Sequence, residues 1–135
     1  MSEQATLGWV IVYVPEVERA VEFYERAFGL RRAFVDPTGN FGQLETGSTA
    51  LAFAAEALAD GHLPQGVRRP SADEPPANVE LALVFDDVHG AFAHAVAEGC
   101  TALAEPAPQP QNQVVGWVRD PFGTLIEIAS PIGVS

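Results

Sequence analysis

The sequence predicts an α+β fold built from two tandem β-α-β-β-β modules. Three observations support this prediction: strand-like apolar runs surround one amphipathic helix in each half, the second half repeats the apolar pattern of the first, and turn formers are abundant, with 12 glycines and 11 prolines among 135 residues. So many turn formers do not suit a helical bundle. With 47% hydrophobic and 19% charged residues, the chain has enough apolar material for a folded core.

The first half is predicted to form a strand, a helix and three further strands. Runs of β-branched, aromatic and small apolar residues predict strands at Leu7–Val14, Arg31–Val35, Phe41–Glu45 and Thr49–Ala54. Apolar residues three and four positions apart predict a helix over Glu16–Phe28, with charged residues on its other face and a glycine just past its end.

Residues 55–78 break this pattern. They are small, polar or proline, with a short helical turn expected at Glu56–Ala59. A stretch of this length and composition is a connector, and a candidate lid or linker between modules.

The second half is predicted to repeat the first. The matching pairs are Val10–Val17 with Leu81–Val88, Gly42–Thr46 with Gly116–Asp120, and Thr49–Ala54 with Thr124–Ala129. We therefore expect one domain over residues 1–135, with module 1 at 7–54, the connector at 55–78 and module 2 at 79–130. Asp86 and Asp87 are expected to begin the second helix, and Glu105–Gln113, rich in Pro and Gln, is predicted to be a loop.

Strand alternation assigns the residues of each module to two sheet faces. One face is uniformly apolar and is expected to pack beneath the helices, whereas the other mixes aromatic, small and acidic residues, which suits a cavity. The candidate ligand-binding residues on that second face are Trp9, Tyr13, Ala52, Glu80, Trp117 and Glu127. Glu80 and Glu127 are also the candidate catalytic residues, because two close carboxyl groups raise the pKa of one and provide a proton donor and an acceptor.

Two segments carry a family resemblance. Trp9–Leu30, with its Phe23-Tyr24 and Phe28-Gly29-Leu30 motifs, and Asp120–Glu127, with its Asp-Pro-x-Gly turn, resemble the vicinal oxygen chelate superfamily. That superfamily includes glyoxalase I, extradiol dioxygenases, fosfomycin-resistance enzymes and bleomycin-binding proteins. The resemblance implies sheets that curve around a U-shaped cavity, and a homodimer.

The resemblance also implies where metal ligands would lie. The first-strand ligand positions fall on Trp9 and Glu80, and the last-strand positions on Ala52 and Glu127, of which only Glu127 has the usual residue type. Two carboxylates without an imidazole are a poor site for Zn²⁺, Ni²⁺ or Fe²⁺. We therefore predict no metal site and no cofactor, although Glu80 and Glu127 suit a weakly held Mg²⁺ or Ca²⁺.

Charge and hydropathy exclude several partners. The formal net charge is −11 and no Lys/Arg run is present, which argues against binding to nucleic acid or to an anionic membrane. The apolar runs are too short to span a bilayer. Cys100 is the single cysteine and is expected to be a buried filler, and Met1–Leu7 lacks the pattern of a secretory signal, so we expect a cytoplasmic protein.

Two functions remain open at this point. The first is a metal-independent protein that binds a small neutral or cationic, partly aromatic ligand, with Trp9, Tyr13 and Trp117 stacking on it and the two glutamates pairing with it. Antibiotic sequestration is one use of such a protein. The alternative is a glyoxalase- or dioxygenase-type enzyme, a lyase, isomerase or oxidoreductase, that uses an atypical metal site or Glu80 and Glu127 as an acid–base pair.

Overall fold

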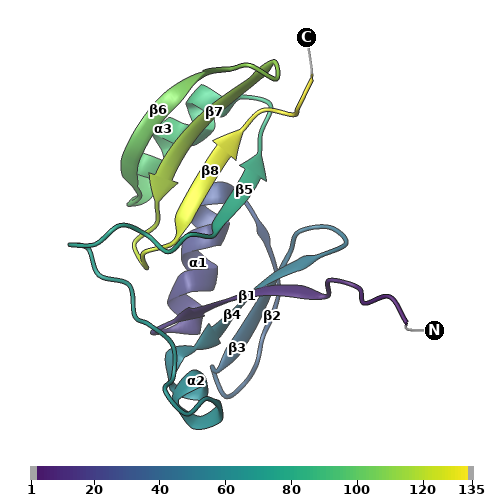
Figure 1. Cartoon of the computed structure of the whole chain (residues 1–135), viewed down its shortest axis with the longest axis vertical. Coiled ribbons are helices and arrows are strands. Elements are labelled where there is room, and N and C mark those ends of the chain that lie inside the picture. Colours follow the sequence, from purple (N-terminus) through teal and green to yellow (C-terminus); the bar gives the residue numbers. More distant parts are fainter. Residues whose placement is uncertain (1–2, 134–135) are drawn as a thin grey trace. The chain divides into compact units, whose positions relative to one another are not determined.

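A computed structural model describes residues 3–133 and divides the chain into two compact units, with the division between Arg68 and Arg69. Each unit contains one four-stranded mixed sheet and a helix in β-α-β-β-β order (Figure 1). The predicted α+β fold class is confirmed. Met1 and Ser2, the first residues of the stretch inspected for a secretory signal, lie outside the described residues.

The first unit follows the predicted order of elements. Its elements are β1 (Trp9–Val14), α1 (Val17–Phe28), β2 (Arg31–Val35), β3 (Phe41–Glu45) and β4 (Ala50–Ala55), followed by α2 (Glu56–His62). The strands lie in the order β1-β4-β3-β2, with β1 parallel to β4 and the other neighbours antiparallel. The helical turn expected at the start of the connector is therefore a longer helix, α2.

Helix α1 covers one face of this sheet because its apolar stripe matches the apolar face of the strands. Tyr24 is fully buried and its ring meets that of Phe53 on β4 edge to face, with centroids 4.9 Å apart. The helix ends at Gly29, whose φ of 68° is the left-handed conformation that glycine adopts without strain. The core of the unit lies between α1 and the sheet.

The second unit has the same arrangement. Its elements are β5 (Glu80–Val84), α3 (Val88–Glu98), β6 (Thr101–Gln109), β7 (Gln113–Arg119) and β8 (Leu125–Ala129), with the strands in the order β5-β8-β7-β6. Asp87 caps α3, as expected, because its side chain accepts a hydrogen bond of 2.9 Å from the backbone N–H of Gly90. None of the helices within residues 3–133 combines the length and the apolar character needed to cross a bilayer.

The loop predicted at Glu105–Gln113 is wrong. Strand β6 continues to Gln109, and β7 begins at Gln113, so only a short turn separates them. The prolines are the reason that a loop was predicted. Because β6 is an edge strand, a proline there can face the side that has no partner strand, where no backbone N–H is needed. Two register shifts in β6 accommodate the irregular backbone.

Two equivalent glycines let each helix approach its sheet closely. A Cβ atom on Gly42 of β3 would lie 2.9 Å from Val17 Cγ1, and one on Gly116 of β7 would lie 3.1 Å from Phe92 Cδ2. The sequence repeat aligns these two glycines, and the structure gives the physical reason: both are contact points between a helix and the third strand of its module.

We predict that Gly42→Ala lowers the free energy of unfolding by about 1–3 kcal/mol, because the added methyl group overpacks the contact between α1 and β3. Urea denaturation followed by circular dichroism measures the effect. Gly8→Ala is the matched control, since a Cβ atom there meets nothing within 4 Å. Equal urea midpoints for Gly42→Ala and Gly8→Ala would contradict the explanation that Gly42 is needed for the close contact between α1 and β3.

Candidate functional site

The candidate site of the second unit lies on the sheet face opposite α3. On the helix side, Val118, Ile126 and Ile128 are fully buried. Strand pairing places the side chains of the other face in rows across β7, β8 and β5: Arg119, Leu125 and Glu80 in one row, then Trp117, Glu127 and Ala82 in the next. We call these six residues the unit-2 face. Three of the predicted site residues therefore lie on one surface.

A hydrogen bond from Trp117 to Glu80 organises this face. The indole Nε1 donates to Oε1 of Glu80 at 3.1 Å. Because β8 lies between β7 and β5, the indole must extend across β8 to reach the carboxylate. Glu127 is the cross-strand neighbour of Trp117 on β8, so the indole passes beside this second carboxyl group.

The two glutamates form a hydrogen-bonded carboxyl pair. Partial burial raises the pKa of Glu127 above its ordinary value, and the hydrogen bond to Glu80 and the charge of Glu80 raise the pKa further. The direction of the shift makes Glu127 a weaker acid than an exposed glutamate. The pair thus combines a carboxyl group that loses its proton less readily with a second carboxyl group that accepts a hydrogen bond from an indole.

The first unit carries a corresponding aromatic surface. The indole Nε1 of Trp9 on β1 donates to Oε1 of Gln43 on β3 at 3.1 Å, crossing β4 to do so. Trp9 remains 55% exposed, whereas Ala52 on β4 is fully buried. Tyr13 is half-buried and lies on the same face as Trp9, four residues along β1. Ala52, a predicted ligand-binding residue, therefore exposes no surface to a ligand in this structure.

The two indole hydrogen bonds join equivalent positions of the two modules, but the donor and the acceptor are exchanged. In the sequence repeat Trp9 aligns with Glu80 and Gln43 aligns with Trp117, so the donor sits on the first strand of one module and on the third strand of the other. Strand alternation placed these residues on one face. It did not predict the bonds, because alternation fixes the face of a side chain but not its rotamer.

The residues at the family's ligand positions do not fit a transition metal. Trp9 and Ala52 offer no side-chain ligand atom, so only the carboxyl groups of Glu80 and Glu127 remain, without the imidazole or thiolate ligands that Zn²⁺, Ni²⁺ and Fe²⁺ prefer. All three histidines are exposed on helices, His62 on α2 and His89 and His94 on α3. Within residues 3–133, no group of three or more His, Cys, Asp or Glu side chains is placed to hold a metal ion.

Cys100 does not supply a nucleophile. Its side chain is buried, and burial together with the charge of Asp120 raises the pKa of the thiol to about 12. A thiol with such a pKa carries almost no thiolate near neutral pH. The structure thus gives the cysteine the buried position expected for a filler.

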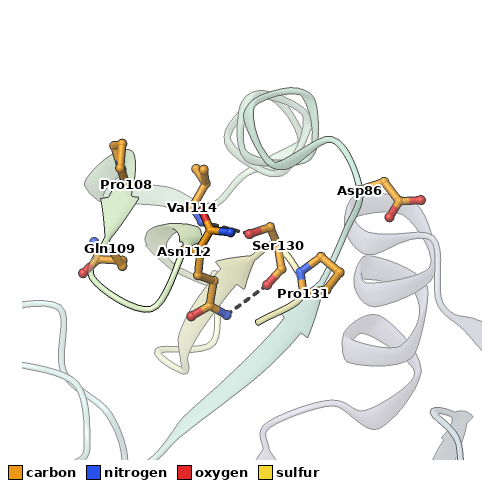
Figure 2. Close-up of a pocket in the computed structure, with 8 residues that line it drawn as sticks. Asp86, Pro108, Gln109, Asn112, Val114, Ser130 and Pro131 are labelled. Atoms are coloured by element: carbon orange, nitrogen blue, oxygen red, sulfur yellow. Dashed lines mark hydrogen bonds between the residues drawn. The ribbon is translucent and has the colours of Figure 1, made fainter. Parts of the chain in front are cut away.

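A separate pocket of about 460 Å³ opens at the carboxyl ends of β5 and β8 (Figure 2). It is lined by Asp86, Pro108, Gln109, Asn112, Gln113, Val114, Ser130 and Pro131. None of the predicted site residues lines it. Two of its polar side chains are already bonded within the wall, because Gln113 Nε2 donates to the carbonyl of Ser130 and the Ser130 hydroxyl accepts from the N–H of Val114. The pocket contains no aromatic residue.

Sequence reasoning missed Arg119. Its guanidinium donates to three backbone carbonyls, those of Gly123, Glu74 and Ser71. One signal was available: Arg119 is the only Lys or Arg among residues 70–135, and strand alternation puts it on the same face as Trp117. Two of its three partners, Ser71 and Glu74, belong to the connector, which has no periodicity to place them.

Comparison with known proteins supports the fold. The profile of the Glyoxalase/Bleomycin resistance protein/Dioxygenase superfamily matches residues 6–128. A glyoxalase-related enzyme from Fulvimarina pelagi is 19% identical with a TM-score of 0.78, covering 95% of this chain and 89% of that one. TioX from Micromonospora sp. ML1 is 20% identical with a TM-score of 0.68, covering 93% and 98%. At such identities the solved structures show a common fold alone, and a search of curated proteins found no significant match.

We predict that Glu80→Gln lowers the pKa of Glu127 toward its ordinary value, because the neighbouring negative charge is removed. Carbon-13 NMR of the side-chain carboxyl groups measures both titrations. Glu105→Gln, which removes an exposed carboxylate from β6, should leave Glu127 unchanged. A Glu127 that titrates like an exposed glutamate in the unmodified protein would contradict the carboxyl pair.

The same pair should make stability depend on pH. Since the pKa of Glu127 is higher in the folded state than in the unfolded chain, the folded protein is favoured while Glu127 is protonated and loses stability as pH rises through the folded pKa. Urea denaturation at several pH values should show this loss in the unmodified protein. Glu127→Gln should show a smaller loss over the same range.

Proposed function

The chain belongs to the Glyoxalase/Bleomycin resistance protein/Dioxygenase superfamily, and from that membership we propose a small-molecule-binding protein that works without a transition metal and holds a neutral or cationic, partly aromatic ligand. The observation that carries the proposal is the bond from Trp117 to Glu80 beside Glu127. It joins an aromatic surface to a carboxyl pair on one open sheet face.

Each part of this arrangement favours a cation with an aromatic or apolar body. An indole face attracts a cation through its quadrupole, and a carboxylate beside it adds a direct charge interaction. Glu80 is exposed, so its carboxylate is accessible to a ligand. Ala82 and Val84 extend the surface along β5, and Val84 is 61% exposed, which provides apolar area for the body of the ligand.

The same face disfavours anions. Arg119 is its only basic residue among those described, and three of the guanidinium N–H donors are engaged by backbone carbonyls. An anionic group near Glu80 would meet a like charge without a free cation to offset it. The overall charge of −11 acts in the same direction.

Trp9 and Tyr13 are proposed as a second aromatic surface for stacking. The large exposed fraction of Trp9 supports this role, as does the burial of Ala52, which removes that residue from the contact surface. Sequestration of an antibiotic is one use of such surfaces, and the superfamily's name includes bleomycin resistance proteins. A weakly held divalent cation at Glu80 and Glu127, and a homodimer, remain part of the proposal.

A second candidate is acid–base catalysis in an isomerase or lyase reaction. It is favoured by the position of Glu127 beside Glu80, where burial and the neighbouring carboxyl group raise the pKa of Glu127. Glu80 would accept a proton from a carbon atom of the substrate, and Glu127 would donate its own proton to a substrate oxygen. The proton gained by Glu80 would then return to Glu127 through the hydrogen bond between them, which restores the starting state.

We predict that benzyltrimethylammonium binds at the unit-2 face and shifts the indole N–H resonance of Trp117. Nitrogen-15 NMR titrations compare it with benzyl alcohol and with phenylacetate, which are neutral and anionic. We expect the cation to bind most tightly and Glu80→Gln to weaken its binding about tenfold, the effect of losing one charge–charge interaction near the protein surface. Glu105→Gln is the control and should change the affinity less than twofold.

Two results would count against this function. Tightest binding of phenylacetate would contradict the charge preference. Absence of any shift at Trp117 with all three probes at millimolar concentration would contradict a ligand-binding face. Trp9→Phe, measured with the same probes, tests whether the first unit contributes to binding.

A further inference from the structure

The last part of the connector is fastened to the turn between β7 and β8. We call residues Pro70–Glu74 the strap. Arg119 donates from Nε to the carbonyl of Gly123 at 3.1 Å, from Nη1 to the carbonyl of Glu74 at 2.8 Å and from Nη2 to the carbonyl of Ser71 at 3.2 Å. One guanidinium thereby ties the strap to the turn at two points.

Packing at the turn adds to this attachment. A Cβ atom on Gly123 would lie 2.4 Å from Cβ of Pro70, so the strap approaches the turn as closely as a glycine permits. The strap is also a compact turn in itself, because the N–H of Glu74 donates to the carbonyl of Ser71 and the N–H of Asp73 donates to the Ser71 hydroxyl. It is therefore held by both hydrogen bonds and sterics.

The path of the chain places the strap at one end of the unit-2 face. At Glu74 the chain is bonded to Arg119 of β7, and at Glu80 it begins β5, on the other side of β8. Two strand spacings, about 10 Å, separate β7 from β5. The segment that follows the strap must therefore cross the end of β8, at the row that contains Arg119, Leu125 and Glu80 (Figure 1).

We propose that the strap and the segment that follows it, up to Glu80, form the end wall of the ligand-binding face and that Arg119, by fixing the strap, is a specificity-determining residue that limits the size of the ligand's cationic group. This inference rests on the proposed function. Glu80, which would pair with the cation, is in the row beside the wall. The opposite end of the face, at Ala82 and Val84, is exposed. The ligand class is therefore a compact ammonium group with an apolar or aromatic body that extends along β5.

The first measurement needs no ligand. Hydrogen–deuterium exchange with mass spectrometry reports the amides of the strap in the full chain. We expect Arg119→Gln to speed exchange at Ser71–Glu74 at least tenfold, since the variant cannot hold both strap carbonyls. Arg68→Gln, at an exposed connector position, is the matched control and should leave this exchange unchanged. Unchanged exchange in Arg119→Gln would overturn the fastening role of Arg119.

The second measurement compares two ammonium ions that differ only in the size of the head group. Benzyltrimethylammonium should bind the unmodified protein about tenfold more tightly than benzyltriethylammonium, because added methylene groups meet the wall. In Arg119→Gln the ratio should fall to about twofold, while Arg68→Gln should keep the original ratio. If Arg119→Gln speeds exchange in the strap but leaves the ratio of the two affinities unchanged, the wall does not limit the size of the cationic group, even though binding itself persists.

If the proposed binding function is wrong, the titrations give a result that differs from both outcomes above. If neither ammonium ion shifts the Trp117 indole resonance of the unmodified protein, the binding function fails and the specificity inference falls with it, whatever the strap exchange shows. Circular dichroism checks that each variant is folded. Should Arg119→Gln unfold, Arg119→Lys provides the same two comparisons. Lysine keeps the positive charge, but its single ammonium group lacks the planar guanidinium that reaches the carbonyls of Gly123, Glu74 and Ser71 together.

Discussion

The hydrogen bond from Trp117 to Glu80 is the interaction on which the candidate site depends. It holds the indole across β8, and it leaves Glu80 beside Glu127 on the same sheet face. An indole in this position reduces the water around Glu127, and burial is the largest cause of the raised pKa of that residue. The aromatic surface and the raised pKa of Glu127 therefore both depend on this one contact.

The duplicated fold repeats this contact without repeating its chemistry. In the first unit an amide, Gln43, accepts from the indole of Trp9, and the strand between them carries alanines. An amide oxygen accepts the same hydrogen bond but neither ionises nor holds a proton near neutral pH. The same geometry thus provides a neutral aromatic surface in one unit and a titratable one in the other, and only the second unit can respond to pH through this contact.

Periodicity explains which features the sequence could predict. Alternation and the internal repeat placed the strands, the helices and the shared face of Glu80 and Glu127, because side-chain direction follows the backbone period. The predicted loop at Glu105–Gln113 failed because proline is compatible with an edge strand, and edge position is a tertiary property. The role of Arg119 was missed for a related reason: two of its three partners are backbone carbonyls of an aperiodic connector, which no residue type identifies.

The departure from the metal-binding pattern is a matter of packing as well as of ligand chemistry. Ala52 occupies one family ligand position and is fully buried, and the indole of Trp9 crosses its strand to reach Gln43. A carboxylate introduced at position 52 would be buried in the path of that indole, where an unpaired charge is costly. A histidine at position 9 would replace the indole that donates to Gln43 with a shorter side chain. Restoring a metal site would therefore require concerted changes at several positions of the sheet face, and the present residues instead stabilise an aromatic surface there.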